Sequence, residues 1–214
     1  MALLTPLGSL PYPQPADAAN IPVHIQSLAE AVDGRTVLRF TDSAARDTKV
    51  TAPVAGMLCW LSSPKQYWYY TGSVWTQLAP APVHKANATG GTTASTAFVE
   101  TLTGSTGDPT AAAFTAPASG SVLVSLGSRI SNSGATGTCF MSANVRASSG
   151  STIVLGAADS RSAISTGTGQ ISASTQYLAT GLTPNSAYTA TAAYRCTAGT
   201  ATFMYRFITV TPVN

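Results

Sequence analysis

Charged side chains are scarce in this sequence: Asp, Glu, Lys and Arg together make up 9% of the 214 residues. An ordinary soluble domain carries about 25%. A surface with so few charges is either covered by neighbouring molecules or kept soluble by the hydroxyl groups of Ser and Thr. The composition therefore favours a protein packed into an assembly, and an ordinary Ser- and Thr-rich β protein is the alternative.

A basic surface is also missing. The net charge is only +3, and binding to nucleic acid needs basic side chains clustered on one face. No apolar run approaches the ~20 residues of a membrane-spanning helix, and the first fifteen residues lack the basic and apolar regions of a signal peptide. We expect no nucleic-acid partner, no membrane and synthesis in a cytoplasm. The basic residues after position 82 are scattered singly: Lys85, Arg129, Arg146, Arg161, Arg195 and Arg206.

Cysteine is rare, with Cys59, Cys139 and Cys196 at spacings that match no zinc site and no disulfide framework. We expect three small, buried thiols in a reducing compartment. A Cys139–Cys196 bridge stays open at this point, because both residues lie in predicted strands.

Catalytic groups are few as well. The two histidines, His24 and His84, lie outside any nucleophile motif, and no glycine run forms a phosphate loop. Acid–base cleavage of a polysaccharide needs paired carboxylates, and residues 83–214 offer only Glu100, Asp108 and Asp159. Acidic residues are also too sparse for a calcium site. We therefore expect no enzyme activity, no metal and no cofactor.

Proline dominates the first twenty residues, at positions 6, 11, 13 and 15. Because proline lacks an amide donor, residues 1–20 are predicted to be an extended arm that lies along a partner or stays free. A helix of roughly twelve residues should follow, with Asn20 as its cap and Gly34 as its end. Its apolar stripe needs a second surface, which is either a three-fold axis or the chain's own sheet. The stripe comprises Ile21, Ile25, Leu28, Ala29 and Val32.

Aromatic side chains gather in one short segment, QYWYYTGSVWTQL (residues 66–78). The segment predicts a β-hairpin with a turn at Gly72 and Ser73. Alternation then puts Trp68, Tyr70 and Trp75 on one face. Since a lone hairpin buries at most one face, the second must meet another subunit, the chain's own core or a sugar. The predicted second face holds Tyr67, Tyr69, Thr76 and Leu78, and the predicted cross-strand pairs are 70–75, 69–76, 68–77 and 67–78.

The remaining chain divides at its proline and glycine residues. Residues 21–80 are predicted to be a small α+β attachment or trimerisation domain, 81–95 a linker, and 96–214 an antiparallel β-sandwich. The spacing of strands and turns favours a jelly roll, with an immunoglobulin- or fibronectin-like sandwich as the alternative. Its core is predicted to contain Phe98, Phe114, Phe140, Tyr177, Tyr188, Tyr194, Phe203, Tyr205 and Phe207.

Several segments of the sequence resemble those of one group of proteins. PYPQPADAANIPVHIQSLAEAVDGR, RFTDSAARD, PVAGMLCWLSS and QYWYYTGSVWTQL resemble the N-terminal region of minor tail and virion-surface proteins of tailed bacteriophages, especially those infecting actinobacteria. FTAPASGSVLVSL and GLTPNSAYTATAAYRCTAGTATFMYRFITVTP are similar to their C-terminal β-sandwich modules. The resemblance implies a homotrimeric, non-enzymatic structural protein on the particle surface, which binds the major capsid protein or tail proteins.

These expectations define a function and an interface. The protein is expected to decorate or stabilise the capsid, or to form a minor tail component, and head and tail locations stay open. The alternative is a receptor- or glycan-binding module whose loops, SNSGATG, ADSRSAIST and LTPNS, contact the host surface. The predicted subunit or virion interface comprises Tyr12, Ile25, Leu28, Val32, Tyr67, Trp68, Tyr69, Tyr70 and Trp75.

Overall fold

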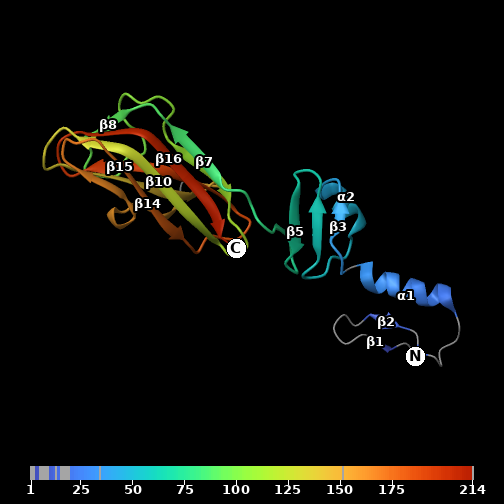
Figure 1. The fold of residues 1–214 in the computed structure, drawn as a ribbon. Coiled ribbons are helices and arrows are strands. Elements are labelled where there is room, and N and C mark those ends of the chain that lie inside the picture. Colours follow the sequence, from blue (N-terminus) through green and yellow to red (C-terminus); the bar gives the residue numbers. More distant parts are fainter. Residues whose placement is uncertain are drawn as a thin grey trace. The chain divides into compact units, whose positions relative to one another are not determined.

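The structure is a computed structural model that describes residues 3–4, 10–12, 14, 20–33, 35–150 and 152–213. For residues 3, 4 and 33 it describes the backbone alone. The chain forms two compact units, Met1–Ala79 and Pro80–Asn214 (Figure 1). Most regular elements are strands, which confirms the predicted mainly β fold with a small α+β part at its N-terminus.

The described part of the predicted arm is extended. Strand β1 (Leu3–Leu4) pairs antiparallel with β2 (Pro11–Tyr12). Residues 1, 2, 5–9, 13 and 15–19 of that arm lie outside the described residues. Helix α1 (Ile21–Asp33) begins as predicted, because the Asn20 side-chain oxygen accepts a 3.3 Å hydrogen bond from the amide of Val23. Gly34, the predicted end of the helix, also lies outside the described residues.

A four-stranded sheet completes the N-terminal unit. Its order is β3 (Leu38–Phe40), β4 (Leu58–Leu61), β5 (Gln66–Tyr70) and β6 (Trp75–Gln77). Helix α2 (Ser43–Lys49) connects β3 to the parallel strand β4, and Asp42 caps it through the amide of Ala45 at 2.8 Å. The hairpin has the predicted register, with Tyr70 opposite Trp75. Gly72 has the positive φ of +105° expected of the turn.

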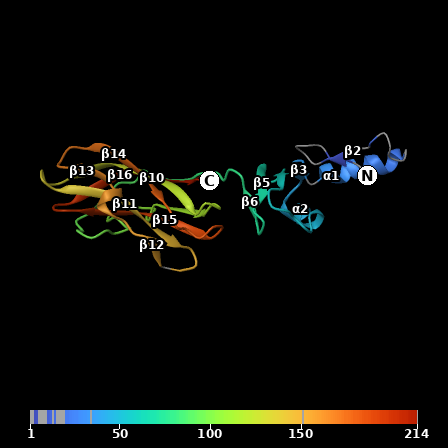
Figure 2. The same cartoon turned by 90° about the horizontal axis from the view of Figure 1, so that it is seen from below.

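The C-terminal unit is an antiparallel β-sandwich of two sheets, seen in Figures 1 and 2. The first sheet has the order β14-β10-β16-β7, and β8 also pairs with β16. The second has the order β12-β11-β15-β9, and β13 also pairs with β11. The strands are β7 (Val83–Asn87), β8 (Gly91–Thr93), β9 (Ala111–Thr115), β10 (Ser121–Asn132), β11 (Thr138–Ala147), β12 (Ile153–Leu155), β13 (Ala163–Thr166), β14 (Ile171–Ala179), β15 (Ala187–Cys196) and β16 (Ala201–Val213), with a 3₁₀ turn η1 at Asp159–Arg161.

The connections between strands show which sandwich this is. From β8 to β11, and again from β13 to β16, each strand lies in the sheet opposite to its predecessor. An immunoglobulin-type sandwich instead keeps its last two strands in one sheet. The alternation is that of a jelly roll, so the predicted jelly-roll class is confirmed.

The predicted linker over residues 81–95 is not a linker, because it contains β7 and β8. Both strands pair with β16 at the edge of the first sheet. The sequence did not reveal them because edge strands are held by backbone hydrogen bonds and need little apolar alternation. Gly91 serves close packing there rather than flexibility, since a Cβ at this position would lie 2.6 Å from the Cβ of Leu102.

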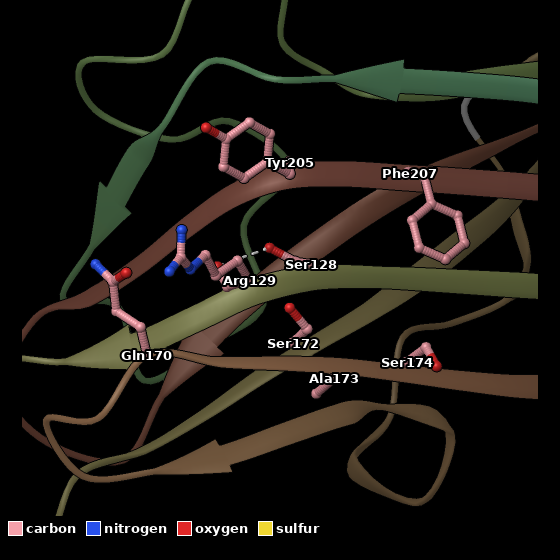
Figure 3. Close-up of a pocket in the computed structure, with 8 residues that line it drawn as sticks. All are labelled: Ser128, Arg129, Gln170, Ser172, Ala173, Ser174, Tyr205 and Phe207. Carbon is pink, nitrogen blue, oxygen red and sulfur yellow. Dashed lines mark hydrogen bonds between the residues drawn. The ribbon is translucent and has the colours of Figure 1, made fainter.

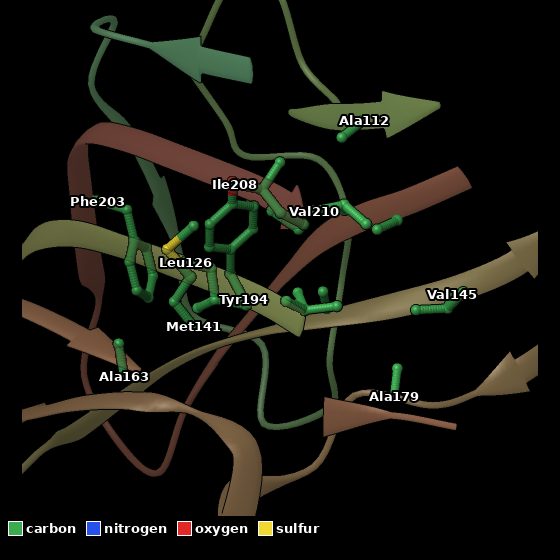
Figure 4. Packing of buried hydrophobic residues seen from close by; sticks show 14 of the residues in the cluster. Ala112, Leu126, Met141, Val145, Ala163, Ala179, Tyr194, Phe203, Ile208 and Val210 are labelled. Carbon is green, nitrogen blue, oxygen red and sulfur yellow. The ribbon is translucent and has the colours of Figure 1, made fainter. Parts of the chain in front are cut away.

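The core lies between the two sheets (Figure 4). Tyr194 and Phe203 fill it with rings whose centroids are 4.9 Å apart, as predicted. Tyr205 and Phe207, however, lie on the outer face of the first sheet, because a β-bulge changes the alternation of β16. Cys139 and Cys196 are opposite each other on β11 and β15, and both are free, fully buried thiols.

Candidate interaction surfaces

Most of the apolar stripe of α1 is exposed within the part of the chain that the structure describes. Ile21 and Ile25 have 68% and 63% of their surface exposed, and Leu28 has 43%. Strand β2 runs beside the helix and forms with it an apolar groove of about 370 Å³. The structure thus brings together three predicted interface residues, Tyr12, Ile25 and Leu28, and leaves the half-buried Val32 outside the groove lining. The groove is lined by Leu10, Pro11, Tyr12, Ile21, His24, Ile25 and Leu28.

One face of the aromatic hairpin is covered by α2. Arg46 of this helix is 5% exposed, and its guanidinium carbon lies 4.6 Å from the ring centroid of Trp75 and 5.8 Å from that of Trp68. Its Nε donates to Asp47 at 2.8 Å. Trp68 and Trp75, together with Tyr70, are therefore half-buried against the chain itself.

Arg46 was missed by sequence reasoning. The available signal was its place in a capped helix between two strands, which a parallel crossover packs against the sheet. Burial raises the pKa of the Cys59 thiol on this same face, and the nearby Arg46 guanidinium partly opposes that rise.

Part of the opposite face of the four-stranded sheet is exposed. Tyr67 is 48% exposed, and its ring lies 4.8 Å from that of Trp60. Val37 and Arg39 complete a shallow pocket of about 350 Å³ beside these rings. Of the predicted interface residues, Tyr67 and Tyr69 belong to this face. The two faces of the hairpin differ as expected from alternation, and only one of them is packed against α2.

The three carboxylates of the sandwich lie at separate places, each paired with a different arginine. Glu100 pairs with Arg146, Asp159 with Arg195, and Asp108 with the fully buried Arg206. Within the described residues, no group of three or more His, Cys, Asp or Glu side chains could hold a metal ion. None of the described helices is both long and apolar enough to cross a membrane.

The two histidines lie in different surroundings. His24 belongs to the apolar groove beside α1. His84 lies on β7, where its Nδ1 is 2.8 Å from the Thr209 hydroxyl and its ring stacks 6.1 Å from that of Phe207.

A second groove lies on the outer face of the first sheet (Figure 3). Its volume is about 520 Å³, and it crosses β14, β10 and β16. Gly127 of β10, next to the lining residues Phe207 and Ala173, has no room for a side chain, since a Cβ would lie 2.7 Å from Cε1 of Phe207 and 2.8 Å from the Ala173 oxygen. Sequence reasoning placed ligand contacts in the loops and missed this surface. The groove is lined by Ser128, Arg129, Gln170, Ser172, Ala173, Ser174, Tyr205 and Phe207.

No protein-family model matches this sequence, and no curated protein matches it. Among solved structures, the chain is similar to one described as the structure of Eiger TNF from S. frugiperda, with 12% sequence identity and a TM-score of 0.38. The match covers 64% of this chain and 94% of that chain.

Proposed function

We propose that the protein is a non-enzymatic structural component of a bacteriophage virion. In this role the N-terminal unit joins three copies and anchors them to the major capsid protein or to tail proteins. The jelly-roll sandwich is displayed on the particle surface, as capsid decoration or as a minor tail component.

The exposed apolar groove between α1 and β2 supports this role most directly. A thirteen-residue helix is too short to be stable alone in water, and each Å² of apolar surface removed from water contributes about 25 cal/mol. Covering the groove with other copies of the chain would stabilise the helix and the assembly together. The low charge of the chain, 9% of residues, favours the same arrangement.

Self-association of the purified chain tests the first part of the proposal. We expect sedimentation equilibrium to give a trimer for the wild type and a smaller species for Ile25→Asp, because a carboxylate in the contact loses hydration without gaining a partner. Val23→Asp is a matched control, since Val23 is an exposed residue of α1 that does not line the groove. A monodisperse wild-type monomer would contradict the proposal.

Particle location tests the second part. An antibody against the sandwich should label particles of the bacteriophage that encodes the chain, and many copies over the head would indicate capsid decoration. A few copies at the tail tip would favour the tail location. Unlabelled particles that also lack the chain by mass spectrometry would exclude a virion role.

A further inference from the structure

The outer face of the first sheet carries an arginine without a countercharge. Arg129 is exposed on β10, at the groove of about 520 Å³. The three acidic side chains of the sandwich pair elsewhere, with Arg146, Arg195 and Arg206. Within the described residues, the Arg129 guanidinium makes no ion pair or hydrogen bond. Its five donors are free to bind an anion from outside the chain.

An aromatic ring is fixed beside this arginine by the backbone. Tyr205 has a φ of +50°, which is uncommon for a residue with a side chain. It lies in the β-bulge of β16, where the register against β10 shifts between Gly127 and Arg129. The bulge turns Arg206 into the core and leaves Tyr205 with 58% of its surface exposed next to Arg129 (Figure 3). Strained backbone of this kind clusters at functional sites and ligand contacts, so an exposed ring held at a positive φ is evidence for a contact.

The remaining lining supplies the other groups that a sugar needs. Phe207 gives a second apolar ring in the groove. Gln170, Ser172 and Ser174 bring an amide and two hydroxyls to the β14 side, where they can both donate and accept hydrogen bonds (Figure 3). These groups suit one kind of ligand. The rings can pack on the C–H face of a pyranose, the hydroxyls can bind its hydroxyls, and the guanidinium can bind a carboxylate.

We propose that this groove binds an acidic saccharide, one that carries a uronic or sialic carboxylate. Arg129 binds the carboxylate, Tyr205 and Phe207 pack against the sugar ring, and Gln170, Ser172 and Ser174 bind its hydroxyls. A neutral sugar would leave Arg129 unused, and a simple anion would leave both aromatic rings unused. The site lies entirely within the sandwich, so its binding does not depend on self-association through α1.

Binding of the full chain to saccharides tests this proposal. The probes are an array of uronic- and sialic-acid oligosaccharides, each with its carboxyl-reduced neutral counterpart, and titration calorimetry of the best acidic probe. We expect the acidic form to bind better than the neutral form, and the affinity to fall as salt is added. Arg129→Gln should weaken the acidic form by about tenfold or more and remove the preference, because a charge-assisted hydrogen bond is lost.

Two further variants identify the contacts. Tyr205→Asn, chosen because Asn tolerates a positive φ, should weaken the acidic and neutral forms alike. Arg35→Gln removes an exposed arginine that lines none of the three grooves and pockets described above, and it should change neither. Circular dichroism and sedimentation of each variant check its fold and its oligomeric state.

Three results would overturn the proposal. The first is a wild-type chain that binds none of the acidic probes. The second is binding that ignores the carboxylate, shown by equal affinity for the acidic and neutral forms or by an Arg129→Gln variant that binds as the wild type does. The third is a change of oligomeric state in Arg129→Gln or Tyr205→Asn, which would identify this face as a contact between copies.

Discussion

Arg206 and Asp108 form an ion pair inside the sandwich, where the arginine side chain is fully buried and the carboxylate is 5% exposed. Arg206 also donates to the Thr89 oxygen at 2.7 Å and to the Ser105 hydroxyl at 2.6 Å. Asp108 in turn accepts from the amide of Leu102 at 3.3 Å. The pair therefore holds the segment from residue 89 to residue 108 against β16.

Removing one charge of the Arg206–Asp108 pair should destabilise the sandwich. Asp108→Asn leaves the Arg206 guanidinium buried without a countercharge, and we expect a loss of about 3 to 5 kcal/mol in the free energy of unfolding. Urea unfolding followed by circular dichroism measures it. Asp159→Asn is the matched control, because the Asp159 side chain is 51% exposed in its pair with Arg195. It should lose about 1 kcal/mol or less, and equal losses in the two variants would contradict the structural role of the buried pair.

The stability of the N-terminal unit should depend on Arg46. Arg46→Met removes the interaction of the guanidinium with the Trp68 and Trp75 rings, and we expect a loss of about 2 kcal/mol. Tryptophan fluorescence during urea unfolding reports on this unit alone, since all three tryptophans lie between residues 60 and 75. Arg39 occupies an exposed strand position, so Arg39→Met should change the free energy of unfolding by less than about 0.5 kcal/mol. An unchanged midpoint in Arg46→Met would show that α2 does not stabilise the hairpin.

Two glycines with positive φ should respond differently to alanine. Gly120 has a φ of +65°, and a Cβ there would lie 2.4 Å from the Leu182 carbonyl oxygen. Gly104 has a φ of +77° and open space around it. Gly104→Ala should lower the free energy of unfolding by about 1 to 2 kcal/mol, because it adds backbone strain alone. Gly120→Ala should lower it by about 3 kcal/mol or more, because a backbone clash is added to the strain. Thermal unfolding measures both, and similar losses would mean that the turn before β10 relaxes freely.

Alkaline pH should destabilise the sandwich through Tyr177. Burial raises its pKa from 10.0 to about 12, partly opposed by the Arg161 guanidinium. Below pH 10 both states hold the phenol proton. Above it the unfolded state loses the proton first, so stability falls until about pH 12. Between pH 10 and pH 12, we expect the free energy of unfolding of Tyr177→Phe to fall by about 2 to 3 kcal/mol less than that of the wild type.

Neutral pH provides the control for that variant. The Tyr177 hydroxyl is buried and forms no hydrogen bond with the described residues, so Tyr177→Phe should lie within about 0.5 kcal/mol of the wild type at pH 7. Urea unfolding at a series of pH values gives both results. Identical pH profiles for the two proteins would show that Tyr177 does not cause the alkaline loss.

Local patterns predicted the elements whose partners are close in sequence. The cap at Asn20 and the Tyr70–Trp75 register each depend on residues a few positions apart. Alternation and turn spacing likewise predicted the jelly-roll class. The α1 stripe was read correctly as apolar, and the structure adds that β2 lies beside it and leaves a groove.

Local sequence patterns did not predict the contacts between segments that are distant in the chain. The sequence predicts a linker where β7 lies and a core position for Tyr205, and it does not single out Arg46. In each case the deciding partner lies in another element. The bulge of β16 is one extra residue, yet it reverses which side chain of the 205–206 pair enters the core.

The sequence by itself determined the local elements of this protein, because backbone propensity and alternation act over a few residues. Only the tertiary structure decided which faces are covered, where the buried charges pair and where a groove opens. Those outcomes depend on burial and charge pairing between strands that are far apart in the chain, and the residue types alone do not specify which surfaces meet.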